Sequence, residues 1–416
     1  MALVDPLERE CAAVRRWLSI VGIGEDGADG LSPVARGLIA DAELVFGGKR
    51  HLQLAGGLIR GTARAWPSPF ENGIAEVLAA RGRSVCVLAS GDPFLYGVGS
   101  VLMRHVDACE TLTVPAPSAF SLAAARLGWA LADTVILSLH ARAQDRIRPH
   151  LQPGVRLLAL TSDDKGPAAL ARLLVGAGFG RSKFMILEAL GGPRERIRET
   201  TAENFSANDI DPLNTVAIEV VASPGARVLA RASGLADALF EHDGQITKRE
   251  IRAVTLSSLS PRRGELLWDI GAGSGSVAIE WMLADPSMRA VAIEARADRA
   301  ARIRRNAAAF GVPGLAVIEG EAPVVLGDLG GPPDAIFIGG GAKSSGLIEA
   351  AMAALRSGGR LVVNGVTLAT ESLLNGHYAR HGGELTRIAV ARAEPLGGTI
   401  GWRPAMPVTQ WSWTKS

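Results

Sequence analysis

The amino-acid sequence predicts an α/β protein with two domains, each built around an open, largely parallel sheet. Its length of 416 residues exceeds what a single hydrophobic core usually holds. Short apolar runs of strand length alternate with helical patterns through both halves of the chain. A glycine-containing turn also follows an apolar run in each half, at residues 22–24 and 271–275. Such turns between a strand and a helix are typical of ligand sites in parallel sheets.

Composition excludes several classes of protein. Hydrophobic residues make up 48% of the chain and charged residues 21%, which indicates globular domains. The net charge of +2 and the lack of a basic block give no electrostatic footprint for nucleic acid. No apolar run is long enough to cross a bilayer and no signal-peptide pattern is found, so we expect a cytoplasmic protein with no membrane partner. The cysteine and histidine spacings predict no metal site.

The elements of the first half follow from the alternation of apolar runs and helical patterns. The sequence predicts helices at 33–40, at 71–80 and from 119, and strands at 18–23, 42–46, 84–89, 112–114, 134–139, 155–160, 184–188 and 214–221. This order predicts an open parallel sheet.

Two turns in this half have a defined chemistry. Gly91, Asp92 and Pro93 follow a buried strand, and they form a turn in which proline fixes one dihedral angle and aspartate can bond its own backbone. A second, proline-bounded turn enters the alanine-rich helix near Ser118 and Ala119. Each turn places backbone groups at the end of a strand.

A linker separates the halves. Residues 222–234 contain Pro224, Gly225 and Gly234, so we predict a first domain at 17–221 and a second at 235–414. Thr247 and Glu250 have capping-box spacing and predict the start of a helix. The pattern then predicts strands at 266–270, 291–294, 315–318, 335–338 and 360–363, with helices between them. This order fits a doubly wound sheet.

The glycine turn of the second domain indicates its ligand. Ser276 stands where a dinucleotide-binding motif has its third glycine, and Asp269 would repel a pyrophosphate but suits an ammonium group. Glu294 follows about 20 residues later, at the distance from which an acidic side chain binds both ribose hydroxyls. These three residues favour S-adenosylmethionine over a nicotinamide cofactor. A glycine turn without a ligand is the alternative.

The motifs taken in order resemble a known family. Residues 21–24, the run from Ser90 to Gly97, residues 117–119, 138–140 and 190–191 resemble the tetrapyrrole methylases, a two-lobed α/β fold. Residues 244–252 and the glycine turn resemble a decarboxylating partner with a Rossmann-like, doubly wound methyltransferase fold. The whole chain thus resembles the decarboxylating C(5,15)-methyltransferases of cobalamin biosynthesis, which fuse the two. In the first turn this chain has Glu25 where many tetrapyrrole methylases have proline.

The resemblance implies two S-adenosylmethionine sites per chain. The first would be formed by Gly91, Asp92, Phe94, Gly97, Ser118, Ala119 and Ala189. The second would be formed by Thr247, Asp269, Gly271, Ala272, Gly273, Ser274, Gly275, Glu294 and Ala322.

The implied activity is methylation of carbons 5 and 15 of precorrin-6, with C5 assigned to the first domain, and loss of an acetate carboxyl to give precorrin-8X. The tetrapyrrole substrate carries many carboxylates, so basic side chains should bind it. We predict Arg142, Lys248 and Arg252 for this role, with Arg146, Arg194, Arg249 and Lys343 as further candidates. We also expect a homo-oligomer. The alternatives are a methyltransferase acting on nucleic acid or another small molecule through an N-terminal recognition domain, and a non-catalytic regulatory protein that binds the cofactor.

Overall fold

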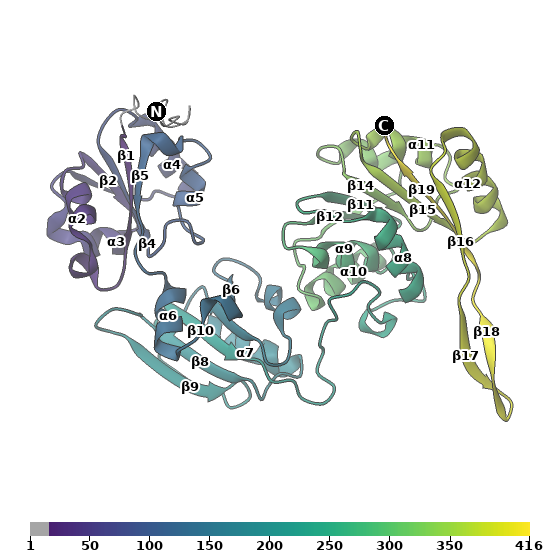
Figure 1. Ribbon diagram of the computed structural model, residues 1–416, viewed down its shortest axis with the longest axis horizontal. Coiled ribbons are helices and arrows are strands. Elements are labelled where there is room, and N and C mark those ends of the chain that lie inside the picture. Colours follow the sequence, from purple (N-terminus) through teal and green to yellow (C-terminus); the bar gives the residue numbers. More distant parts are fainter. Residues whose placement is uncertain (1–15) are drawn as a thin grey trace, which may run out of the picture. The chain divides into compact units, whose positions relative to one another are not determined.

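The computed structural model describes residues 16–416 (Figure 1). The chain folds into two compact units. The N-terminal unit extends to residue 142 and resumes at residues 152–227. The C-terminal unit consists of residues 143–151 and 228–416.

The first sheet of the N-terminal unit is parallel and has the strand order β3-β2-β4-β1-β5. Leu18 and Ile20 of β1 pack into one core cluster, whereas Val21 and Ile23 pack into another. The central strand is therefore covered on both faces, which explains its continuous apolar run. The elements are β1 (Leu18–Ile23), α2 (Pro33–Ala40), β2 (Leu44–Gly47), α3 (Lys49–Ala55), β3 (Thr62–Ala65), α4 (Phe70–Ala79), β4 (Val85–Ser90), α5 (Gly99–Leu102) and β5 (Thr111–Val114).

A second sheet in this unit is mixed, with the order β6-β7-β10-β8-β9. Strand β10 is antiparallel to β7 and β8, and β8 is antiparallel to β9. The expectation of a single open parallel sheet is therefore wrong for this part of the chain. The short turn after Glu188 joins β8 directly to β9, and so short a link permits only antiparallel pairing. The elements are α6 (Ala119–Leu127), β6 (Thr134–Ser138), β7 (Arg156–Leu160), α7 (Gly166–Gly176), β8 (Lys183–Glu188), β9 (Arg196–Thr201) and β10 (Asn214–Glu219).

The C-terminal unit has a seven-stranded sheet with the order β13-β12-β11-β14-β15-β19-β16. The strands from β13 to β15 are parallel, and β19 is antiparallel to both β15 and β16. This confirms the doubly wound fold. The elements are α8 (Arg249–Leu259), β11 (Leu266–Ile270), α9 (Ser276–Ala284), β12 (Arg289–Glu294), α10 (Ala297–Ala309), β13 (Ala316–Glu319), β14 (Ala335–Ile338), α11 (Leu347–Ala354), β15 (Arg360–Gly365), α12 (Leu368–His381), β16 (Glu384–Ile388) and β19 (Val408–Thr414).

The start of α8 differs from its prediction. Lys248 is the N-cap residue and no side chain caps the helix, so the capping box predicted from Thr247 and Glu250 is wrong. The Thr247 carbonyl accepts a hydrogen bond from the Arg252 guanidinium, which holds Thr247 outside the first helical turn.

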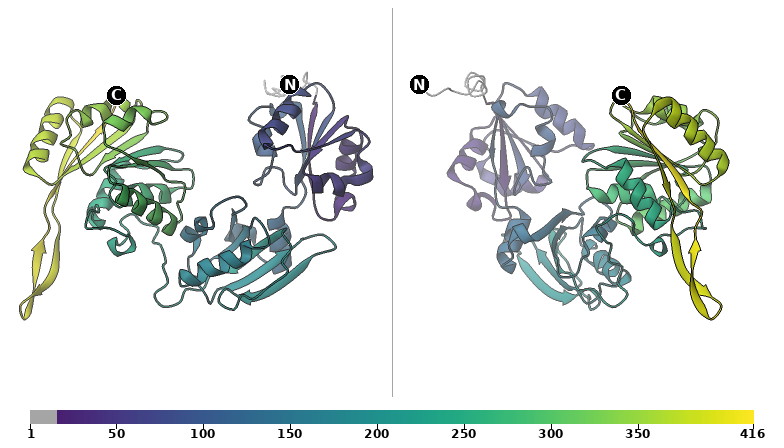
Figure 2. Two further views of the ribbon diagram at one scale, coloured as in Figure 1. Left: turned by 180° about the vertical axis from the view of Figure 1, so that it is seen from behind. Right: turned by 45° about the vertical axis from the view of Figure 1, so that its right-hand side comes forward.

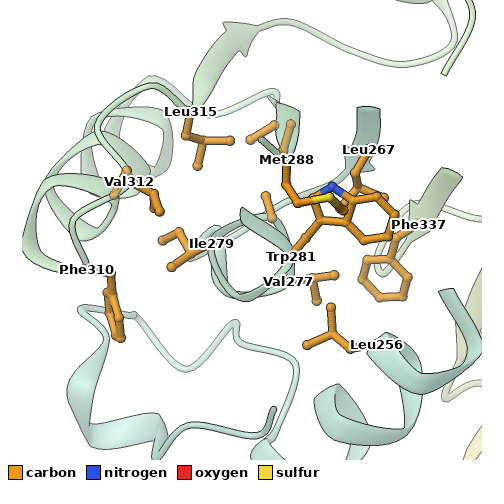
Figure 3. Close-up of a cluster of buried hydrophobic side chains, with 14 of the residues drawn as sticks. Leu256, Leu267, Val277, Ile279, Trp281, Met288, Phe310, Val312, Leu315 and Phe337 are labelled. Carbon is orange, nitrogen blue, oxygen red and sulfur yellow. The ribbon is translucent and has the colours of Figure 1, made fainter. Parts of the chain in front are cut away.

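One hydrophobic cluster fixes the helices against this sheet. Figure 3 shows Trp281 of α9 beside Met288 and Leu267, with Phe337 of β14 close by. Trp281 is fully buried, and its indole N–H donates to the Arg289 carbonyl at 3.1 Å. These contacts pack α9 against β11 and β14.

A two-stranded hairpin, β17 (Ala391–Leu396) and β18 (Thr399–Pro404), is separate from the seven-stranded sheet. It projects beyond its own unit in each view, in yellow (Figures 1 and 2). Leu396, Ile400 and Trp402 on this hairpin are exposed. Among residues 16–416, no helix has the length and apolar character that a membrane crossing requires.

Candidate functional site

A cavity of about 820 Å³ lies where the parallel strands of the C-terminal unit end. We refer to it as the C-terminal cavity. Residues that follow β11, β12, β13 and β14 line it, together with Asn364 near the end of β15. Ligands of doubly wound sheets bind at this edge. Seven of the predicted site residues line it: Thr247, Lys248, Gly271, Ala272, Gly273, Glu294 and Ala322.

The turn after β11 requires its glycines. Gly271, Gly273 and Gly275 have φ values of +71°, +60° and +75°, which disfavour residues with a side chain. A Cβ atom on Gly271 would lie 2.8 Å from the Gly340 carbonyl oxygen, and one on Gly275 would lie 2.7 Å from Ile303. Gly271 and Gly273 thus form the cavity wall, whereas Gly275 lets α9 approach α10.

Glu294 is buried and lies on the cavity wall. One carboxylate oxygen accepts from the Gly273 N–H at 2.8 Å, and the other accepts from the Arg296 N–H at 3.1 Å. These two bonds fix the carboxylate and leave lone pairs on both oxygens. Glu294 can therefore accept hydrogen bonds from the two hydroxyls of a ribose.

Asp269 lies behind the turn, outside the set of residues that line the cavity, and is 1% exposed. Its Oδ2 accepts from the Ala278 N–H at 3.1 Å, and its Oδ1 has no hydrogen-bond partner within residues 16–416. Burial raises the pKa of Asp269 to about 7, and the nearby Glu294 carboxylate contributes in the same direction. An additional cation near this pair would compensate two buried carboxylates.

Two predicted residues of the turn also lie outside the cavity. The Ser274 carbonyl accepts from Asn306 Nδ2 at 2.9 Å, which ties the turn to α10. Gly275 packs on Ile303, as described above. Ser274 and Gly275 thus stabilise the conformation of the turn.

Basic side chains also line the cavity. Lys248, Arg299 and Arg392 are among its residues, and the last two pair with Asp243 and Glu250. The hydrogen bond from Arg299 holds the pKa of Asp243 well below its usual range. Sequence reasoning missed Arg299 and Arg392 because neither belongs to a motif. Arg299 belongs to α10 and Arg392 to β17, and these elements reach the cavity only in the folded chain.

The prediction that Arg252 binds the substrate needs correction. Arg252 is fully buried and does not line the cavity. Its Nε donates to Glu280 at 2.6 Å, and its Nη1 lies 3.1 Å from Asp237. The guanidinium also lies over the Phe240 ring. The Arg252 guanidinium therefore forms a buried ion pair that links α8 to α9.

The predicted residues of the N-terminal unit gather at the ends of β1, β4 and β5. A Cβ atom on Gly22 would lie 1.9 Å from the Gly91 carbonyl oxygen, and one on Gly91 would lie 2.8 Å from the Pro117 carbonyl oxygen. Three chain segments therefore meet with no room for side chains. Asp92 accepts from the Phe94 N–H at 2.8 Å, as the turn chemistry predicts. Gly97 packs on Pro93.

The remaining residues of this unit occupy helix and strand ends. Ser118 caps α6 by accepting from the Ser121 N–H at 3.0 Å, and Ala119 is the first residue of that helix. Ala189 follows β8 with φ +45°. Arg142 lies over the ring of Tyr96, with its guanidinium carbon 5.6 Å from the ring centre.

Glu25, the departure from the family pattern, forms ion pairs with Arg50 and Arg194. Arg194 also pairs with Asp211. The turn after β1 is thus held by charged side chains at the position where many tetrapyrrole methylases have proline.

The fold and the C-terminal cavity define a methyltransferase domain of the class I type, in which a strand, a glycine turn, a helix and a distant acid form one site. Residues 238–415 match the family model described as "Precorrin methyltransferase domain", and residues 18–206 match "Tetrapyrrole (Corrin/Porphyrin) Methylases". The chain is 59% identical over 413 residues to the precorrin-6Y C(5,15)-methyltransferase [decarboxylating] of a Sinorhizobium species, covering 99% of this chain and 100% of that one. The chain therefore belongs to the precorrin-6Y C(5,15)-methyltransferase (decarboxylating) family.

Other relatives carry the same name. The precorrin-6Y C(5,15)-methyltransferase [decarboxylating] of Mycobacterium tuberculosis is 43% identical and covers 95% of this chain and 99% of that one. A solved structure of the C-terminal domain of the Rhodobacter capsulatus precorrin-6Y C5,15-methyltransferase is 48% identical, covers 45% of this chain and 100% of that chain, and has a TM-score of 0.43. This chain is accordingly a decarboxylating methyltransferase.

Proposed function

We propose that this chain uses S-adenosylmethionine to methylate carbons 5 and 15 of precorrin-6Y and releases one acetate carboxyl as carbon dioxide, giving precorrin-8X. Relatives that match nearly its full length carry this activity in their names. The observation that carries the proposal is the C-terminal cavity, which joins a glycine turn and a buried acid to basic and apolar residues.

The proposal divides the work between two domains, at 17–221 and 235–414, joined by a linker at 222–234. The first domain would methylate C5 at its own cofactor site, formed by the Gly91 loop, Ser118, Ala119 and Ala189. The second would methylate C15 and remove the carboxyl. Each chain would then bind two molecules of S-adenosylmethionine.

At the cofactor end of the C-terminal cavity, the role of the chain is to hold S-adenosylmethionine in the correct position. Gly271 and Gly273 keep the wall free of side chains, and Glu294 offers its carboxylate to the ribose. When bound, S-adenosylmethionine supplies an already activated methyl group. Holding two reactants in register contributes up to about 7–11 kcal/mol to such a reaction, so no nucleophilic triad is required.

At the other end, the chain offers groups that suit a macrocycle bearing carboxylates. Lys248 and Arg392 line the cavity and carry charges that would bind these carboxylates. Val366 and Met406 also line the cavity and are exposed, as a surface for an apolar ring face requires. In the N-terminal unit, Arg142 beside Tyr96 is the corresponding candidate.

Titration calorimetry tests the two cofactor sites. We expect two S-adenosylmethionine molecules per wild-type chain and one per chain in Gly273→Ala and in Gly91→Ala. Gly264→Ala is the matched control, since Gly264 has φ +83° but open space around it. A wild-type stoichiometry of one, or the loss of both sites in either single variant, would contradict the two-site proposal.

We also expect the chain to form a homo-oligomer. The exposed Leu396, Ile400 and Trp402 of the hairpin provide an apolar surface that a second copy could cover. Sedimentation equilibrium of wild type and of Trp402→Ser tests this: the variant should dissociate at higher concentration, and a monomeric wild type would refute it.

A further inference from the structure

A chain of hydrogen-bonded polar side chains lies under one end of the C-terminal cavity. Thr255 of α8 is fully buried, Gln410 of β19 is 2% exposed and Asn364 of β15 is 8% exposed. Asn364 and Gln410 are directly paired in the register of β15 and β19. Burying polar groups among three core elements costs free energy unless they are hydrogen-bonded, so the partners of each donor and acceptor are informative.

The Gln410 amide is fully used. Its Nε2 donates to Asn364 Oδ1 at 2.9 Å and to Thr255 Oγ1 at 3.1 Å. Its Oε1 accepts from the hydroxyl of Ser258 at 2.8 Å. The result is a fixed amide that holds the oxygen of Asn364.

Within residues 16–416, the Asn364 amide nitrogen makes one hydrogen bond and keeps its second N–H free. Its Nδ2 donates one hydrogen to Thr255 Oγ1 at 3.0 Å, and the amide nitrogen carries two. Of the three side chains that bond one another, Asn364 is the one that lines the cavity. A spare N–H held by a bonded network at a cavity wall is a preorganised donor for a ligand.

The position of Asn364 indicates which ligand it meets. Gly271, Glu294 and Ala322 follow β11, β12 and β13, whereas Asn364 belongs to β15, on the other side of β14. Two strand spacings separate β15 from β11, about 10 Å in the plane of the sheet. Val366 and Arg392 line the same cavity. Asn364 therefore lies at the substrate end.

We propose that Asn364 donates its spare N–H to the acetate carboxylate that the substrate loses, and that Gln410 is the positioning residue that holds Asn364. The inference rests on the proposed function. A cation beside this carboxylate would stabilise the charged ground state and oppose its conversion to neutral carbon dioxide. A neutral amide orients the same group with less stabilisation of its charge. Lys248 and Arg392 then hold the carboxylates that remain.

The step balances without a group from the protein. The bond between the acetate methylene and the carboxyl carbon breaks, carbon dioxide leaves, and the electron pair enters the conjugated ring system. A proton taken up by that system then converts the methylene to a methyl group. Asn364 neither gains nor loses a proton, and it fixes the carboxylate so that the breaking bond aligns with the ring orbitals.

The test measures carbon dioxide release from precorrin-6Y by the full chain, with cofactor affinity measured separately by calorimetry. Asn364→Ala should lower the turnover number for carbon dioxide about 100-fold. Asn364→Asp should in addition raise KM, because its charge repels the substrate carboxylate. Both variants should bind S-adenosylmethionine with wild-type affinity. Gln410→Leu should lower turnover with little change in KM, as expected of a positioning residue.

Controls separate this role from a structural one. Asn375→Ala, at an exposed position of α12, should leave carbon dioxide release unchanged. If Asn364→Ala does not fold, Ser258→Ala removes only the outer bond of the network and should still slow release. Wild-type-like release from folded Asn364→Ala overturns the inference while the proposed function stands, as does a loss explained by weaker cofactor binding. A wild-type chain that releases no carbon dioxide overturns both.

Discussion

Glu294 combines near-complete burial with a place on the cavity wall, and both of its oxygens are held by backbone N–H groups. Glu294→Gln should weaken S-adenosylmethionine binding about 10- to 100-fold, because a hydrogen bond to a charged acceptor contributes about 1.5–3 kcal/mol. Calorimetry measures the affinity. Glu319→Gln is the matched control, since Glu319 is the register partner of Glu294 on β13 and is exposed. Equal affinities in the two variants would contradict the role of Glu294.

Asp269 should make cofactor binding depend on pH. Its pKa is raised to about 7 by burial, so the free protein holds a proton there below that pH. A bound cation favours the carboxylate and releases the proton. S-adenosylmethionine carries ammonium and sulfonium charges, so its affinity should rise as the pH increases through about 7. Calorimetry in buffers of different ionisation enthalpy should detect the released proton. The Asp269→Asn variant should bind the cofactor without releasing a proton. Binding without proton release would refute the coupling.

Substitutions at Arg252 and Lys248 should have different effects, the first on stability and the second on substrate binding. Removing Arg252 leaves Glu280 buried without its ion pair, so Arg252→Met should destabilise the C-terminal unit by about 3–5 kcal/mol. Lys248 is exposed at the cavity, so Lys248→Met should leave stability unchanged and raise KM for the tetrapyrrole. Urea unfolding and steady-state kinetics measure the two effects. A stable Arg252→Met variant with a raised KM would restore Arg252 as a substrate ligand.

At the scale of the element, the turn between β11 and α9 could be predicted from the sequence because its determinants are local. Gly271, Gly273 and Glu294 were identified by their order and spacing, and they line the cavity. The capping box and the role of Arg252 were wrong because the Arg252 guanidinium binds the Thr247 carbonyl and Glu280, which no local pattern reveals. The antiparallel pairing of β8 and β9 likewise depends on contacts that no local pattern reveals. So does the placement of Arg299 and Arg392 at the cavity.

Gly275 tests how tightly α9 is packed against α10. Gly275→Ala places a Cβ atom 2.7 Å from Ile303 at a φ of +75°, whereas Gly264→Ala adds comparable backbone strain in open space. Gly275→Ala should therefore destabilise the C-terminal unit by at least about 1 kcal/mol more than Gly264→Ala. Thermal unfolding of both variants, with and without S-adenosylmethionine, measures the difference. Equal destabilisation by the two variants would show that α10 moves to accommodate the added Cβ atom at no free-energy cost.

At the scale of the whole molecule, two unrelated folds supply two glycine-lined turns with different backbone chemistry. In the C-terminal unit one turn follows one strand, and a buried acid completes the site. In the N-terminal unit, backbone near Gly22, Gly91 and Pro117 meets at a shared point. The family match over nearly the full chain joins these two folds in one enzyme.

The proposed activity requires that one chain add two methyl groups and remove one carboxyl. Incubation of the purified chain with precorrin-6Y and methyl-labelled S-adenosylmethionine, followed by mass analysis of the tetrapyrrole and of the gas phase, tests it directly. We expect a product with two labelled methyl groups and one molecule of carbon dioxide released for each molecule of product. A product with no labelled methyl group, or with two labelled methyl groups and its carboxyl retained, would contradict the proposal.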